Sequence, residues 1–222
     1  MTKGNVAPVR AFVFDLDGTL IDSKMDLVHS VNAMLRETGR AEQPVERVAS
    51  YIGHGAPQLI ASVLGPKSSE EQRREGLEIF LHHYQLKMLN LTRPYPGVAE
   101  GLSALNGCAL AVLTNKPTQP SIAILEGLDL RHFFHAVYGG DSFLKKKPDP
   151  AGALAILHEL NVSPSEAAMV GDSDVDIQTA RNAGMLAVGV TYGFGQHNKQ
   201  LCAADLYVAS LTELLPWVER KH

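Results

Sequence analysis

The chain has 222 residues, of which 45% are hydrophobic and 20% charged, a composition typical of a globular protein with one large domain or a medium one carrying an insertion. Its formal net charge of −4 argues against the basic surface of a nucleic-acid-binding protein, and no apolar run approaches the ~20 residues of a membrane span. Residues 1–10 hold no signal-peptide core, and Cys108 and Cys202 match no metal-binding spacing. We therefore expect a cytoplasmic protein with reduced thiols and with neither a nucleic-acid nor a membrane partner.

The first predicted element is a buried strand over residues 11–14, which runs directly into Asp15-Leu16-Asp17-Gly18-Thr19. A short apolar run that stops at Asp and Gly is typical of a parallel strand. Because side chains alternate along a strand, Asp15 and Asp17 leave its carboxyl end on the same side. Ligands bind at that end of open α/β sheets, and two neighbouring carboxylates there require a proton or a cation between them.

Residues 22–92 show helical patterns and no strand pattern. Four amphipathic segments are predicted to begin at Asp22 or Ser23, at Pro44, near Leu59 and at Ser69. The stretch Arg93-Pro94-Tyr95-Pro96-Gly97 is typical of a linker. We therefore predict an α-helical domain over residues 22–93, inserted between residues 1–21 and residues 94–222 of a second domain.

Strands and helices alternate through the rest of the chain. Apolar strands are predicted at 109–113, 136–138, 167–170, 186–190 and 206–208, with helices between most of them and a helix after the last. This alternation predicts an α/β fold with a doubly wound, mostly parallel sheet covered by helices on both faces.

Polar residues follow the carboxyl ends of several predicted strands. They are Thr114 and Asn115, Gly139-Gly140-Asp141, and Gly171-Asp172 with Asp176. Since parallel strands share one carboxyl edge, we expect these residues to project into the same crevice as Asp15 and Asp17. Taken alone, Asp172 and Asp176 would also suit a helix cap with a solvated face, and Thr114-Asn115 would suit a turn.

Four motifs in this order resemble the signature of the haloacid dehalogenase superfamily. They are Asp15-Leu16-Asp17-Gly18-Thr19, Thr114-Asn115, Lys147-Pro148-Asp149-Pro150 and Gly171-Asp172-Ser173-Asp174-Val175-Asp176. Together the motifs cover nearly the whole chain, and the predicted helical insertion lies where that superfamily has its α-helical cap. The resemblance implies a Rossmann-like core with a cap domain, and it implies that Asp15 is the nucleophile.

These residue types support phosphoryl transfer. The carboxylate of Asp15 can accept a phosphoryl group and form an aspartyl-phosphate, provided that a cation bridges the two negative groups. Asp15 and Asp172 are hard oxygen ligands suited to Mg²⁺, and the resemblance adds the backbone carbonyl of Asp17 as a third metal ligand. Asp176, four residues after Asp172, is expected to order a metal-bound water.

The remaining polar residues have expected roles around the phosphoryl group. The side chain of Asp17 can protonate the leaving alkoxide and later activate water. Thr114 and Asn115 can donate hydrogen bonds to phosphate oxygens, and Lys147, which matches the superfamily lysine, can neutralise the remaining charge. Its neighbours Lys145 and Lys146 are expected to be solvated.

Two features narrow the expected reaction. Within the superfamily, an acid at position 17 implies hydrolysis of a phosphate ester or phosphoryl transfer between sugars. Gly53-His54-Gly55 resembles the G-x-G cap loop of phosphoglycolate phosphatases, which reaches over the substrate. A simple turn between two helices is the alternative for this loop, and His54 stands where that branch often has Asn, which leaves the substrate open.

We therefore expect a Mg²⁺-dependent phosphatase for a small phosphorylated metabolite, with 2-phosphoglycolate as the first candidate, acting through an aspartyl-phosphate as a monomer or homodimer. The alternatives are a sugar phosphomutase of the β-phosphoglucomutase kind, a pyrophosphatase, and a non-catalytic sensor of phosphorylated metabolites. A sensor would be expected to lack Asp15, Asp17, Lys147 or Asp172, and all four are present.

Overall fold

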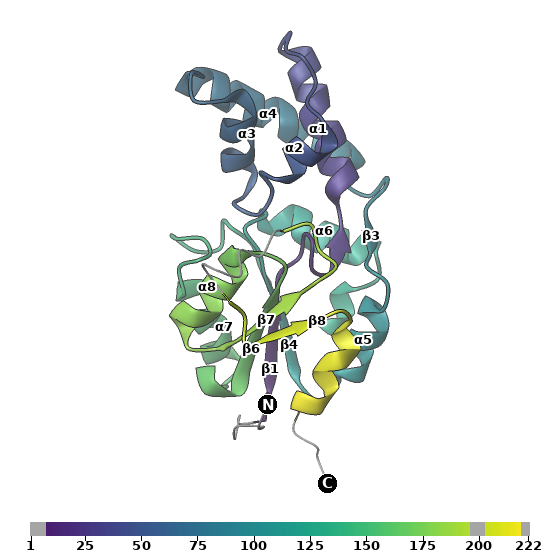
Figure 1. Ribbon diagram of the computed structural model, residues 1–222, viewed down its shortest axis with the longest axis vertical. Helices are drawn as coiled ribbons and strands as arrows, with labels where there is room; N and C mark the ends of the chain where they lie inside the picture. Colours follow the sequence, from purple (N-terminus) through teal and green to yellow (C-terminus); the bar gives the residue numbers. More distant parts are fainter. Residues whose placement is uncertain (1–7, 196–202, 219–222) are drawn as a thin grey trace.

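The computed structural model describes residues 8–195 and 203–218, which form a six-stranded sheet beneath a group of helices (Figure 1). The strand order is β5-β4-β1-β6-β7-β8, and each neighbouring pair runs parallel. The strands are β1 (Ala11–Phe14), β4 (Ala109–Leu113), β5 (Ala136–Tyr138), β6 (Ala167–Gly171), β7 (Leu186–Val190) and β8 (Leu206–Val208). The predicted α/β fold class is confirmed.

Strand β1 lies in the middle of the sheet and is fully buried. Phe12 and Phe14 pack into the core on one face, while Ala11 and Val13 pack into a second core on the other. Burial of each phenylalanine side chain stabilises the fold by about 1.5–3 kcal/mol. This anchoring places the residue after Phe14, Asp15, at the centre of the carboxyl edge of the sheet.

Helices cover both faces of the sheet. The face of Phe12 and Phe14 is covered by α5 (Val98–Ala104), α6 (Thr118–Gly127) and the 3-10 helix η3 (Leu211–Trp217). The opposite face is covered by α7 (Ala151–Glu159) and α8 (Asp174–Ala183). Two further 3-10 helices, η1 (Arg131–Phe133) and η2 (Pro164–Glu166), lie in connections.

The predicted C-terminal helix is a 3-10 helix in the described part of the chain. Its sequence contains Pro216, which has no backbone N–H to donate and whose ring would clash with the carbonyl of the preceding α-helical turn. The tighter 3-10 form is therefore the one that this segment adopts.

Four helices between β2 and β3 stand above the carboxyl edge of the sheet in Figure 1, and we call them the cap. They are α1 (Lys24–Glu37), α2 (Val45–Ala49), α3 (Ala56–Leu64) and α4 (Glu70–Lys87). Ser69 caps the start of helix α4, where the helix was predicted to begin, and its side chain and that of Gln72 form a reciprocal capping box. Helices α1 and α4 pack against each other, and Phe80 and Met34 are buried in the cap.

The two chain crossings between cap and core pair with each other, which the sequence did not reveal. Strands β2 (Ile21–Asp22) and β3 (Arg93–Pro94) form a two-stranded antiparallel sheet. Next to it, the buried carboxylate of Asp26 accepts hydrogen bonds from the backbone N–H groups of Leu91 and Thr92, at 2.9 and 2.8 Å, and from the Thr92 hydroxyl at 2.8 Å. The beginning of α1 is thereby tied to the segment that leaves α4.

The two cysteines and the hydropathy of the helices add little to this picture. Cys108 is buried, and its thiol donates to the carbonyl oxygen of Val9 at 3.5 Å, while Cys202 lies outside the described residues. Within residues 8–195 and 203–218, no helix is both long and apolar enough to cross a membrane.

Candidate active site

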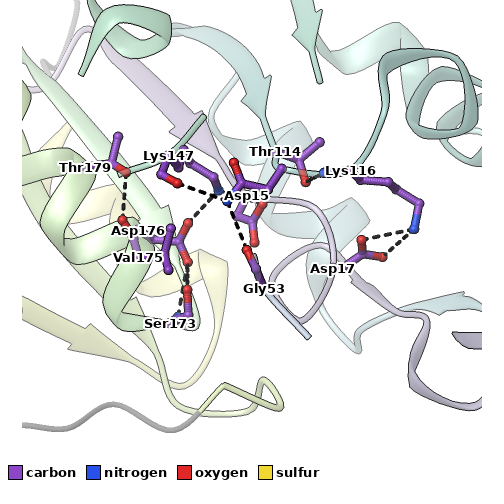
Figure 2. A network of polar contacts seen from close by, with 11 residues as sticks. Asp15, Asp17, Gly53, Thr114, Lys116, Lys147, Ser173, Val175, Asp176 and Thr179 are labelled. Atoms are coloured by element: carbon purple, nitrogen blue, oxygen red, sulfur yellow. Dashed lines mark hydrogen bonds and ion pairs between the residues drawn. The ribbon is translucent and has the colours of Figure 1, made fainter. Parts of the chain in front are cut away.

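Asp15 lies at the centre of a polar cluster on the carboxyl edge of the sheet (Figure 2). Its backbone N–H continues the sheet by donating to the carbonyl oxygen of Val170 at 2.9 Å, and Lys147 Nζ donates to its carboxylate at 2.8 Å. Burial raises the pKa of Asp15 to about 6, although the charge of Lys147 acts in the opposite direction. The neighbouring Lys145 and Lys146 are exposed, as predicted.

Three carboxylates gather beside Lys147. Asp15, Asp172 and Asp176 each offer one oxygen, and these oxygens lie within 4.8 Å of one another. Burial raises the pKa of Asp172 well above its usual value, and the charges of Asp176 and Asp15 add to this effect. Burial acts to lower the pKa of Lys147, but Asp15 and Asp176 outweigh burial and raise it, so that Lys147 remains an ammonium ion.

The donor set of this cluster fits a divalent metal. With all three aspartates ionised and Lys147 protonated, the cluster carries a formal charge of −2, and its oxygens are the hard ligands that Mg²⁺ and Ca²⁺ prefer. Both oxygens of Asp176 already accept hydrogen bonds, from Lys147 Nζ at 2.6 Å and from the N–H and hydroxyl of Ser173 at 3.1 and 2.6 Å. Asp172 accepts one among the described residues, from the Gly195 N–H at 2.6 Å.

Two glycines allow the carboxylates to approach the backbone. Gly18, in the first motif, has a φ of +88°, and a Cβ there would lie 2.2 Å from Asp172 Oδ2. A Cβ at Gly171 would lie 2.2 Å from the Cβ of Asp176. A side chain at either position would therefore displace a carboxylate of the cluster.

Thr114 and Asn115 follow β4, are buried, and adjoin Asp15. The amide of Asn115 donates to the carbonyl oxygen of Gly53 in the cap at 3.0 Å and to that of Lys147 at 3.2 Å. Its Oδ1 atom has no hydrogen-bond partner among the described residues. Asn115 therefore joins the cap loop to the polar edge of the sheet.

Asp17 makes a second polar contact set, centred on Lys116. Lys116 Nζ lies 3.1 and 3.0 Å from the two carboxylate oxygens of Asp17 and donates to the hydroxyl of Tyr84 in α4 at 2.7 Å. Ser23 also donates to Asp17. Burial acts to lower the pKa of Lys116, but Asp17 and Tyr84 raise it overall, and burial raises the pKa of Tyr84 to about 12.

Sequence reasoning assigned no role to Lys116 or Tyr84. Lys116 directly follows Thr114-Asn115 at the carboxyl end of a strand, and this position alone places a cation close to the predicted crevice. Tyr84 left no comparable signal, because an aromatic residue on a helix face is the ordinary pattern of a core.

A cavity of about 60 Å³ separates the cap from the polar edge of the core. Its lining includes Asp15, Asp17, Thr114, Asn115 and Lys116 from the core and Leu27, Ile52, Gly53, Gly55, Leu59, Phe80 and Tyr84 from the cap. Of the predicted cap loop, Gly53 and Gly55 face this cavity. His54 is exposed and lines a different depression, together with Lys24 and Phe194.

A parallel sheet with clustered aspartates at its carboxyl edge and a helical cap above them defines a capped α/β protein with an acidic site. The family model of the haloacid dehalogenase-like hydrolases matches residues 12–190, and the chain belongs to this family. The resemblance drawn from the four motifs is thereby confirmed.

Several relatives are similar to this chain over nearly its whole length. A protein of Nitrosospira multiformis named phosphoglycolate phosphatase is 39% identical over 215 residues, covering 94% of this chain and 92% of the relative. One of Psychrobacter arcticus with the same name is 39% identical over 206 residues, covering 88% and 90%. The crystal structure of a predicted phosphoglycolate phosphatase from Haemophilus somnus superposes with a TM-score of 0.88 at 32% identity, covering 94% of this chain and 97% of that one.

Proposed function

We propose that this chain is a Mg²⁺-dependent phosphatase that hydrolyses 2-phosphoglycolate to glycolate and phosphate. The observation that carries the proposal is the position of Asp15, a buried carboxylate between Lys147 and a small cavity closed by the cap. Membership of a hydrolase family and the names of the relatives described above support the same reaction.

The first half of the reaction forms an aspartyl-phosphate. A carboxylate oxygen of Asp15 attacks phosphorus, and the bond between phosphorus and the ester oxygen breaks. Thr114 and Asn115 bind the phosphoryl oxygens, and Lys147 balances their charge. Asp17 gives its proton to the leaving glycolate oxygen.

The second half regenerates the enzyme. Asp17, now a carboxylate, takes a proton from a water molecule, whose oxygen attacks the same phosphorus atom. The bond to Asp15 breaks, and phosphate is released. Acid–base help of this kind is worth ~10²–10⁴-fold in rate.

The acidic cluster would hold the metal ion. Asp15, Asp172 and the backbone carbonyl of Asp17 are the proposed ligands, and Asp176 would order one of the metal-bound waters. A bound Mg²⁺ supplies positive charge that offsets the repulsion between the carboxylate of Asp15 and an anionic ester.

The cap limits the substrate to a compact ester. Gly53 contacts Asn115 through its carbonyl oxygen, so the cap loop lies directly over the phosphoryl-binding residues. A closed cap excludes bulk water from the aspartyl-phosphate, and the space left after departure of the alcohol admits the hydrolytic water. His54 belongs to the loop that resembles the cap loop of phosphoglycolate phosphatases, but it is exposed and lines another depression, so we propose no contact between His54 and the substrate.

The test is phosphate release from a panel of esters, with Mg²⁺ and with EDTA. The panel contains 2-phosphoglycolate, hexose 1- and 6-phosphates, pyrophosphate and p-nitrophenyl phosphate. We expect a metal-dependent kcat/KM for 2-phosphoglycolate roughly a hundredfold above the others, as its recognition by charged groups predicts. Equal, weak rates on all esters would overturn the assignment of 2-phosphoglycolate as the substrate. The absence of any turnover would overturn the proposed phosphatase activity.

A further inference from the structure

Lys116 is a buried cation to which the proposed phosphoryl transfer assigns no role. The proposed ligands of the phosphoryl group are Thr114, Asn115 and Lys147. Lys147 Nζ donates hydrogen bonds to Asp15 and Asp176. Among the described residues that line the cavity, Lys116 is the one with a cationic side chain. An ammonium ion is costly to bury, so its partners decide what it can do there.

The partners of Lys116 place its ammonium beside Asp17, the proposed acid for the leaving oxygen, and not in the cluster around Asp15. Figure 2 shows its ammonium turned to Asp17 and away from the group formed by Asp15, Lys147 and Asp176. If Asp17 lies one hydrogen bond from the ester oxygen, Lys116 Nζ, one hydrogen bond beyond Asp17, is at most about 6 Å from that oxygen. In 2-phosphoglycolate, the carboxylate is attached to the very carbon that bears the ester oxygen.

An anion in this cavity would depend on hydrogen-bond donors such as Lys116. The walls that the cap contributes include Leu27, Leu59 and Phe80, which cannot solvate a charge. The hydroxyl of Tyr84 accepts from Lys116 Nζ and donates to no described residue, so its proton is available to a second acceptor. Lys116 and Tyr84 together can therefore offer two hydrogen bonds to one carboxylate.

We infer that Lys116, assisted by Tyr84, binds the carboxylate of the substrate and selects phosphorylated carboxylic acids over neutral phosphate esters. The inference rests on the proposed phosphatase function and adds the residues that determine its specificity. When the substrate carboxylate takes the ammonium of Lys116, the pairing of that ammonium with Asp17 is relaxed. Asp17 is then free to carry the proton for the leaving oxygen.

The experiment compares 2-phosphoglycolate with its carboxamide, which has the same shape and a neutral end. The measured quantity is the ratio of the two kcat/KM values. We expect the ratio to exceed 10 in the unaltered protein and to fall roughly 10- to 100-fold in Lys116→Met, as loss of a charge-assisted hydrogen bond predicts. Lys116→Arg should restore part of the ratio, and Tyr84→Phe should lower it by a smaller factor.

The outcomes separate three possibilities. If Lys116 acts only by holding Asp17, Lys116→Met slows both esters equally, and the unchanged ratio overturns the inference. A ratio near one in the unaltered protein overturns it without any variant, even if Lys116→Met does not fold. If the unaltered protein hydrolyses neither ester, the proposed phosphatase itself is wrong.

Discussion

Asp15 is the residue on which the proposed chemistry depends most directly. Asp15→Asn keeps the shape of the side chain and removes the nucleophilic charge, so we expect turnover to fall below detection while the fold persists. The substitution removes one buried charge and adds none. Lys147 would lose its ion pair with Asp15 but keep the one with Asp176, so that no buried ion is left unpaired.

Steady-state phosphate release and circular dichroism together check this expectation. Asp129→Asn is the matched control, since Asp129 is exposed and its backbone has a φ of 56°, which Asn tolerates. Activity retained in Asp15→Asn would refute the nucleophile.

Protonation of the acidic cluster predicts how metal binding depends on pH. Burial raises the pKa of Asp15 to about 6 and that of Asp172 well above its usual value. Below these pKa values the carboxyls hold protons that a metal must displace, so Mg²⁺ affinity should fall as pH decreases below about 6, roughly tenfold per pH unit for each proton displaced.

The same shifts have a defined sign for stability. Because the folded-state pKa of Asp15 is raised, its ionisation destabilises the metal-free protein as pH rises from about 4 to about 6. Added Mg²⁺ should therefore raise the melting temperature more at neutral than at acidic pH. Thermal unfolding with and without Mg²⁺ checks this, and a pH-independent shift, or an equal one in Asp172→Asn, would contradict it.

At the scale of elements, the junction between cap and core depends on Asp26. Its carboxylate accepts three close hydrogen bonds from Leu91 and Thr92, and Asp26→Ala would leave these buried donors without an acceptor. We expect a loss of about 2–4 kcal/mol in the free energy of unfolding. Denaturant titration measures the loss, with Glu78→Ala, on the exposed face of α4, as the control. Equal stability of the two variants would contradict a role for Asp26 in joining the elements.

At the scale of the whole molecule, the close approach of cap and core depends on Gly55. Gly55 and Gly65 have φ values of +86° and +83°, but a Cβ at Gly55 would lie 3.0 Å from the carbonyl oxygen of Asn115, whereas one at Gly65 would meet nothing within 4 Å. Alanine at either position strains the backbone by about 1–2 kcal/mol.

Only Gly55→Ala should hinder closure of the cap. We expect kcat/KM to fall roughly tenfold or more in Gly55→Ala, because small displacements of positioned groups are costly to catalysis. Gly65→Ala should lose comparable stability and little activity. Thermal unfolding and phosphate release on both variants check the difference, and parallel losses of activity would show that backbone strain alone is responsible.

The sequence by itself determined the sheet and the residues at its edge. Apolar runs that end in Asp or Thr identify buried parallel strands, and parallel topology brings their carboxyl ends together, so the closeness of Asp15 and Asp172 could be predicted from the sequence. Each of these patterns lies within one strand and the residues that directly follow it, so it can be recognised from the local sequence alone. Lys147 follows no predicted strand, and its place beside Asp15 was expected only from the resemblance to the superfamily. The roles assigned to the individual residues stay predictions until the variants are measured.

Only the tertiary structure decided how the cap meets the core. The pairing of β2 with β3, two residues each, is too short to leave a pattern, and the turning of His54 away from the cavity depends on how the loop is seated. Lys116 pairs with Asp17, 99 positions away in the chain, and with Tyr84 on a cap helix. Contacts between cap and core carry no local periodicity, and for this reason the pairing of Lys116 with Tyr84 emerged only from the folded chain, although the position of Lys116 after β4 already placed a cation near the crevice.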